Sequence, residues 1–181
     1  MASATPAKLM SVEEFRALPE PVTGPRPELQ FGEVVVMTQP KFKHNDMSRK
    51  LMLLLIEKLG SFGYVDKELA FRALPQNDCR AADVGFISNR RLSLIDPEDN
   101  LAGAPDLVIE VLSPSNSAAE MYERELLCLE NGSIEFWVVC LEKSTIRVAS
   151  RDAASRVYRK GETISLAAFG GGELNMNEVF A

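Results

Sequence analysis

Apolar residues recur along this chain with two periods, which separate the expected helices from the expected strands. The helical period is clearest after Pro40, at Met47, Leu51, Leu54, Leu55 and Leu59. We expect that helix to end at Gly60. A second helix is expected over residues 117–130, with its end at Asn131 and Gly132.

Short apolar runs predict the strands. These runs cover residues 64–74, 81–87, 105–114, 134–140, 145–149 and 156–158. An earlier hairpin is expected over residues 28–37, with its turn near Phe31 and Gly32. Before it, Ser11 and Glu14 have the spacing of a capping box, so a short helix should begin there. This order of elements predicts an α/β or α+β fold, in which helices flank a mixed sheet.

The size and composition of the chain fit one domain. Its 181 residues, 46% of them apolar, are enough for a single core. We assign residues 1–10 to a flexible leader and residues 11–181 to that domain, with a short tail over residues 174–180. No apolar run approaches the roughly 20 residues of a membrane helix, so no membrane partner is expected.

Charge and cysteine content narrow the functional classes. The net charge of −6 and the pI near 5 argue against a broad, nonspecific nucleic-acid surface, but not against a local basic cleft. The three scattered cysteines fit a reducing, cytoplasmic location. With one histidine and no Cys-x-x-Cys pair, a structural zinc site is not expected.

The most informative residues are two acids that interrupt apolar strands. Glu110 stands within residues 105–114, where an unpaired buried carboxylate would cost several kcal/mol, and Asp83 stands near the start of residues 81–87. Acids on two neighbouring strands can bind one hard cation such as Mg²⁺, together with water and phosphate. The other interpretation is structural: Asp83 caps a strand or turn, and Glu110 pairs with a core arginine. The two residues by themselves leave both interpretations open.

Several segments occur in the order and spacing of a known family. They are residues 11–15, 28–29, 32–33, 43–44, 82–87, 103–115, 131–132 and 134–139. Within the longest of them, residues 105–115 read PDLVIEVLSPS. With these segments the chain resembles the Uma-two family of restriction-endonuclease-like proteins, which have the PD-(D/E)XK nuclease fold. The resemblance implies a metal-dependent endonuclease that hydrolyses DNA with Mg²⁺ or Mn²⁺ as its cofactor.

The resemblance also implies roles for individual residues. Asp83 would be the first metal-ligating acid, and Glu110 the acid of the second half-motif. The lysine that usually stands two residues later is missing, because that position is Leu112, and the matching basic residue on the next helix is Arg124. Arginine stays protonated, so Arg124 can stabilise charge on a phosphate but cannot act as a general base.

Three other residues are weighed as site residues. Glu33 matches a glutamate of the family pattern and would be a third acid at the cleft, unless it is a hairpin residue that faces solvent. His44 is the only histidine, and the family pattern favours a catalytic role over a single structural hydrogen bond. Asp106 shares a strand face with Glu110 and is interpreted as an acid at the edge of the strand.

Departures from the family pattern support a second hypothesis. Besides Leu112 and Arg124, Ala82 replaces the usual proline and Cys128 the usual tyrosine. The chain could therefore be a catalytically degenerate protein of the same fold that binds nucleic acid or another protein. A metal-free small-molecule pocket has no support in the sequence.

Two expectations concern association and orientation. A homodimer is expected because cutting a duplex needs two centres or two turnovers, and because residues 134–139 have more apolar side chains than a small sheet must bury. In the helix over residues 117–130, Tyr122, Leu126 and Leu129 share an apolar face, and Arg124 lies away from the centre of that face. Arg124 must nevertheless point into the cleft if it has replaced the family lysine.

Overall fold

A computed structural model describes residues 9–181 except residues 20–23, 25, 115 and 153. Most of the expected leader, residues 1–8, lies outside the described residues. Met10 belongs to the folded part, because its backbone N–H donates to the carbonyl oxygen of Gly32 (2.9 Å). In this described part, no helix is both long and apolar enough to cross a membrane.

Helices and strands alternate along the chain, so the expected α/β class is confirmed. The helices are α1 (Val12–Arg16), α2 (Phe42–Leu59), α3 (Asn89–Leu92), α4 (Ala118–Glu130) and α5 (Met176–Val179), with a 3-10 helix η1 (Ala167–Phe169). The strands are β1 (Glu28–Gln30), β2 (Glu33–Val35), β3 (Gly63–Arg72), β4 (Arg80–Ser88), β5 (Leu101–Ala102), β6 (Leu107–Val111), β7 (Glu135–Cys140), β8 (Thr145–Ser150), β9 (Ser155–Arg159), β10 (Thr163–Ser165) and β11 (Glu173–Asn175).

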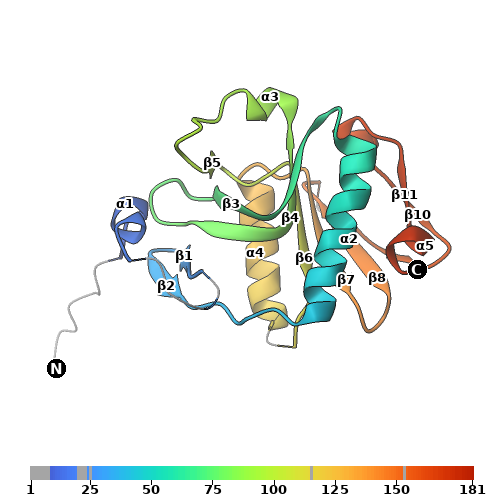
Figure 1. The fold of residues 1–181 in the computed structure, drawn as a ribbon, viewed down its shortest axis with the longest axis horizontal. Coiled ribbons are helices and arrows are strands. Elements are labelled where there is room, and N and C mark those ends of the chain that lie inside the picture. The colour runs from blue at the N-terminus through green and yellow to red at the C-terminus, as the bar shows by residue number, and fades with distance from the viewer. Residues whose placement is uncertain (1–8, 20–23, 25, 115, 153) are drawn as a thin grey trace.

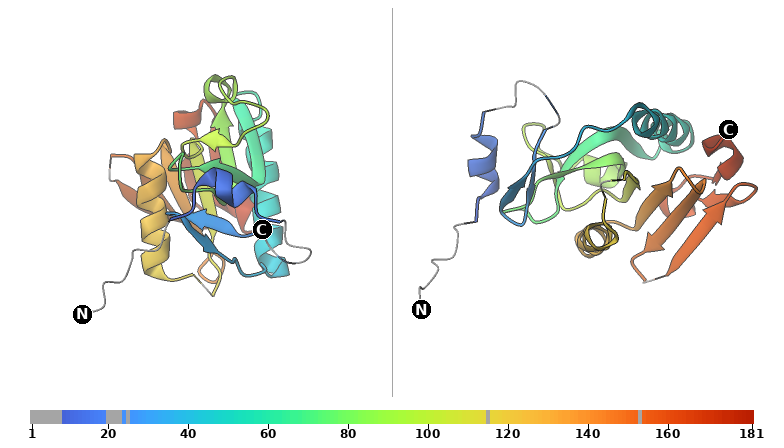
Figure 2. Two further views of the ribbon diagram at one scale, coloured as in Figure 1. Left: turned by 90° about the vertical axis from the view of Figure 1, so that its left-hand side faces the viewer. Right: turned by 90° about the horizontal axis from the view of Figure 1, so that it is seen from below.

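A seven-stranded mixed sheet forms the centre, in the order β5-β3-β4-β6-β7-β8-β9. β6 and β7 are parallel and are connected through α4, whereas β4 and β8 pair antiparallel with them. α2 covers one face of this sheet and α4 the other, as Figures 1 and 2 show. Two small hairpins, β1–β2 and β10–β11, lie outside the central sheet.

The two faces of the sheet carry two separate apolar cores. The α2-side core joins Met47, Leu51, Leu55 and Leu59 to Val84, Ile109, Val111 and Trp137. The α4-side core joins Met121, Leu127 and Cys128 to Ala82, Val108, Phe136 and Val138. Val108 and Ile109 point into different cores, as the two-residue period of a strand requires. The sequence of β6, apolar except for Glu110, therefore reflects burial on both faces.

α4 does not bury the apolar face that Tyr122 and Leu126 suggest. It begins with a capping box, in which Ser117 Oγ accepts the N–H of Glu120 (3.1 Å). Arg124 and Glu125 are among its buried residues, whereas Tyr122 is 59% exposed and Leu126 39% exposed. The face with Tyr122 and Leu126 thus points outward, and Arg124 and Glu125 are buried on the side of the helix that carries the core residues of α4.

Two regions contain short elements that the sequence pattern did not predict. α3 and β5 lie between residues 87 and 105, where no element was expected, and the expected C-terminal tail contains most of β11 and all of α5. β10 and β11 pair antiparallel, and Leu174 and Val179 are fully buried in the α2-side core. Elements of two to four residues are too short to show a period, so only their tertiary contacts reveal them.

The apolar segment behind the homodimer expectation is buried inside the chain. It coincides with β7, which lies between β6 and β8. Trp137 is fully buried and Val138 is 7% exposed. These residues are accounted for by the two cores, so they give no support for association.

Candidate active site

The sheet register places Asp83 and Glu110 side by side. β4 and β6 pair through Val84–Ile109 and the two pairs that follow it. One step further along the same register, Asp83 would face Glu110, but the ladder has ended there. Instead, Asp83 Oδ2 accepts the backbone N–H of Val111 (2.7 Å). The Asp83 carboxylate therefore caps the end of the ladder at the point where the two strands separate.

A local break in β3 and β4 turns Asp83 toward this opening. Their ladder skips one pair, at Glu68 and Asp83, and Glu68 has a positive φ of 53°. Val84 packs in the α2-side core, but Ala82, two residues away, packs in the α4-side core. Residues two apart on a regular strand share a face, so the alternation inverts at Asp83. A non-glycine residue with positive φ is unfavourable and often marks a functional site.

Glu110 lies under α4 in a nearly closed environment. The residue is 8% exposed, and Glu110 Oε1 accepts a hydrogen bond from Arg124 Nε (2.9 Å). Burial, together with the nearby charges of Asp83 and Glu28, raises the pKa of Glu110 from 4.5 to about 8, although Arg124 opposes the shift. Without a second cation, this carboxyl is mostly protonated at neutral pH.

Arg124 points inward and uses its guanidinium on groups of the chain itself. Besides Glu110, it binds Glu28, whose Oε2 lies 2.9 Å from Arg124 Nη1. Its Nη2 also donates to the carbonyl oxygen of Ala81. The residue is 7% exposed. Burial opposes its charge, but Glu110 and Glu28 outweigh that effect and raise the pKa of Arg124. It is a permanent buried cation between two carboxyls.

Glu28 is a site residue that sequence reasoning did not assign. Its Oε1 accepts the N–H of Ala81 (2.9 Å), and backbone hydrogen bonds join Leu29 of β1 to Cys79, the residue just before β4. Burial alone would raise the pKa of Glu28, but Arg124 and these hydrogen bonds together lower it. Glu28 is therefore the ionised partner of Arg124. The acid lies within the resembling segment 28–29, but only the tertiary contact with β4 shows that it is buried.

His44 approaches the site from the first turn of α2. Its Nε2 lies 3.1 Å from Asp83 Oδ2. The hydrogen bond with Asp83 raises the pKa of His44, and partial burial opposes this shift. His44 Nδ1 is buried and has no hydrogen-bond partner among the described residues. Asp83 is thus held from one side by β6 and from the other by α2.

A cleft of about 880 Å³ opens beside these residues. Its described lining includes Glu28, His44, Asp83 and Glu110, and its one lysine there is Lys67 on β3. The candidates Glu33 and Arg124 are not part of that lining. Glu33 is exposed at the start of β2. It directly follows the hairpin turn, in which Gly32 has a positive φ of 84°. The structure brings Asp83, Glu110, Arg124 and His44 together and leaves Glu33 outside.

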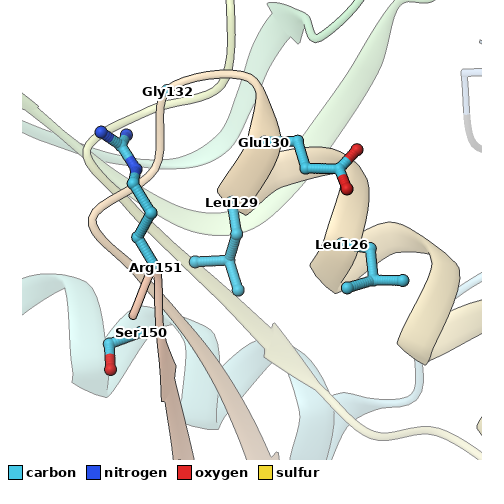
Figure 3. A pocket seen from close by; sticks show the side chains of 6 residues that line it. All are labelled: Leu126, Leu129, Glu130, Gly132, Ser150 and Arg151. Carbon is cyan, nitrogen blue, oxygen red and sulfur yellow. The ribbon is translucent and has the colours of Figure 1, made fainter. Parts of the chain in front are cut away.

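Two other features lie apart from these acids. Asp106 lies just before β6, at the end of that strand opposite Glu110. Its Oδ2 accepts the backbone N–H of Ser88 (2.9 Å), the last residue of β4, so it connects the ends of these two strands. A second hollow of about 490 Å³ lies on the outer side of α4. Figure 3 shows Leu126 and Leu129 beside it, with Arg151 following β8. None of the candidate acids lines this hollow.

Comparison with known proteins shows the family of this chain and a similar fold. The family model Uma2, described as "Putative restriction endonuclease", matches residues 12–177. The chain belongs to the Uma2 family. A search of curated proteins finds no significant match.

A crystal structure of another protein is similar in fold to this Uma2 chain. That structure is titled as a "putative nuclease belonging to DUF820" from Anabaena variabilis. It superposes with a TM-score of 0.79 at 20% sequence identity, and the match covers 94% of this chain and 97% of the other. The similarity supports the same arrangement of sheet and helices, so the nuclease-like fold expected from the sequence is confirmed.

The donor set of this Uma2 chain fits a hard cation that keeps most of its water. Among the described residues, no group of three or more His, Cys, Asp and Glu side chains could hold a metal ion. Asp83 and Glu110 each use only one oxygen in the contacts described above, and Asp83 Oδ1 and Glu110 Oε2 take no part in them. Mg²⁺ often binds through one or two carboxylates with water and phosphate. These two carboxylate oxygens meet that requirement.

Proposed function

We propose that this Uma2 protein is a metal-dependent endonuclease that hydrolyses DNA phosphodiester bonds in the cleft beside Asp83 and Glu110. The observation that carries the proposal is the pair of acids where the ladder between β4 and β6 ends, each with one oxygen outside the hydrogen bonds described above, beside a cleft of about 880 Å³. Asp83 and Glu110 would hold Mg²⁺ or Mn²⁺. Such an ion would supply activation of water and neutralisation of phosphate charge.

The other residues act by positioning these acids. Arg124 fixes the Glu110 side chain and, with Glu28, supplies an ion pair that stays charged at any working pH. Its donors are already used within the chain, so we assign it a positioning role and no contact with the scissile phosphate. His44 and the Val111 N–H fix Asp83 in the same way. We assign no step to Glu33.

The second candidate is a catalytically degenerate protein of the same fold that binds nucleic acid or a protein partner. It is favoured by the state of Glu110, whose pKa of about 8 keeps it protonated when only Arg124 is near. An arginine at the family's basic position also cannot exchange a proton. In this case the cleft would bind without cutting.

Cleavage of supercoiled plasmid during titration with Mg²⁺ and Mn²⁺ tests the choice. The nuclease hypothesis predicts metal-dependent nicking that falls about 100-fold or more in Asp83→Asn and Glu110→Gln. Glu173→Gln changes an exposed acid on β11 and should cut like wild type. Metal-independent cutting, or full activity in Glu110→Gln, would contradict the proposal. Wild type that binds DNA without cutting it, with partial activity in Arg124→Lys, would favour the degenerate protein.

We extend the proposal to a cytoplasmic homodimer. Two active centres would let one assembly cut both strands of a duplex, and the free thiols of Cys79, Cys128 and Cys140 fit a reducing compartment. Light scattering across a concentration series tests the association, and a monomer at the highest concentration would contradict it.

A further inference from the structure

The outer face of α2 carries a stripe of residues with the spacing of a coiled-coil seam. These residues, which we call the α2 seam, are Phe42, Asp46, Arg49, Leu53 and Ile56. Their spacings of four, three, four and three residues average 3.5, the repeat that keeps a seam facing a partner helix. The apolar residues that hold α2 to the sheet lie on another face of the helix.

All five side chains of the α2 seam are exposed, including three large apolar ones. Phe42 is 84% exposed, Leu53 46% and Ile56 44%. Asp46 and Arg49 are also exposed, and neither has an ion pair or side-chain hydrogen bond with any other described residue. Exposed apolar residues that form one stripe suggest a contact surface, whereas single ones do not.

Neighbouring parts of the chain leave the seam open. The C-terminal segment packs along a different side of α2, where Lys58 Nζ lies 3.4 Å from a Glu178 carboxylate oxygen. The described lining of the cleft includes His44, Asn45 and Ser48 from α2 but none of the five seam residues. The seam therefore belongs neither to the cleft nor to the intramolecular packing.

We propose that the α2 seam binds the α2 seam of a second copy of this chain, with the two helices antiparallel about a two-fold axis between residues 47 and 48. In that register Asp46 of each copy faces Arg49 of the other, and Phe42 of each copy faces Leu53 of the other. Two ion pairs lie at the centre and an apolar pair flanks them on each side. Phe42, Asp46, Arg49 and Leu53 are thus complementary to the same four residues of the second copy, as a two-fold interface requires, and Ile56 lies beyond the start of the partner helix.

Charge decides between the possible helix orientations. A parallel pair in register would place Asp46 against Asp46 and Arg49 against Arg49, and like charges at these positions are unfavourable. The antiparallel pair converts both contacts into opposite charges. The same charges thus favour one orientation and disfavour the other.

The size of the surface sets the expected strength of association. α2 has 18 residues, which is about 27 Å of helix at about 1.5 Å per residue. One such pair buries less than the roughly 800 Å² per partner of a standard stable interface. We therefore expect a dimer that forms at tens of micromolar protein and dissociates on dilution.

Sedimentation equilibrium with charge-reversed variants tests the proposal without measuring any catalytic activity. Wild type should show a concentration-dependent dimer. Asp46→Arg and Arg49→Asp should each weaken it about tenfold or more, because each substitution creates two like-charged contacts by symmetry. The double variant, Asp46→Arg with Arg49→Asp, should restore the dimer. Glu123→Arg, on the exposed part of α4, is the matched control and should associate like wild type.

Every outcome of this experiment decides the proposal. A monomeric wild type at the highest concentration would overturn it. A dimer that the single variants leave intact would show that another surface associates, and a double variant that stays monomeric would show that Asp46 and Arg49 do not pair. Phe42→Ala should weaken the dimer both in wild type and in the double variant. Thermal unfolding by circular dichroism checks that each variant is folded.

Discussion

The two acids of the cleft are neighbours in the sheet, but the chain neutralises them in different ways. Glu110 is nearly closed off and meets Arg124, a cation that cannot lose its proton. Asp83 has a side chain that is 23% exposed and meets His44, whose charge depends on pH. The cation on the α4 side of the site is thus fixed, whereas the charge of the histidine on the α2 side can change with pH. Stability should depend mainly on the first and adaptation to a ligand on the second.

Removing the fixed cation should have the largest effect. Arg124→Met leaves Glu28 and Glu110 buried without a partner, and breaking such a buried pair costs about 3–5 kcal/mol of unfolding free energy. Arg124→Lys should cost less, because it keeps the charge but cannot bind both carboxyls at once. Urea unfolding measures both. Arg156→Met removes an exposed ion pair with Glu162 and should cost about 1 kcal/mol or less. Equal losses of unfolding free energy in Arg124→Met and Arg156→Met would contradict the expected difference between the buried and the exposed ion pair.

The pH dependence of stability should reveal the protonated state of Glu110. Its pKa is raised from 4.5 to about 8, so the folded state prefers the protonated form. The stabilising contribution is complete below about pH 4.5 and is lost as the pH rises through about 8. His44, whose pKa is also raised, acts in the same direction. Glu110→Gln should therefore flatten the fall in unfolding free energy between these limits. A slope identical to that of wild type would contradict the assignment.

Removing the adjustable partner should have the smallest effect on stability. His44→Ala deletes the contact with Asp83 Oδ2, but the Val111 N–H still binds that carboxylate. We expect a loss of about 1 kcal/mol, the usual size of one hydrogen bond. A loss as large as that of Arg124→Met would mean that the two sides of the site are equally important for stability.

Much of the fold could be predicted from the sequence, but the partners at the site could not. The apolar run of β6 and the helical spacing of apolar residues in α2 reflect burial, so the sequence pattern alone identifies both elements. Asp83 and Glu110 stood out because acids are rare in such apolar strands. Their partners did not, because Glu28 becomes buried only when β1 packs on β4. The outward face of α4 is a second example. Met121, Leu127 and Cys128 pack toward the sheet, and buried carboxyls bind Arg124 on the same side, so Tyr122 and Leu126 are left outside.

The central claim is that Asp83 and Glu110 hold a divalent cation, and calorimetric titration with Mn²⁺ tests it most directly. Titration at pH 7 in buffers of different ionisation enthalpy also counts the protons released. Because Glu110 has a pKa of about 8, wild type should bind one ion and release about one proton. Glu110→Gln should bind weakly or not at all and release none. Binding in Glu110→Gln that equals wild type in affinity and proton release would contradict the account.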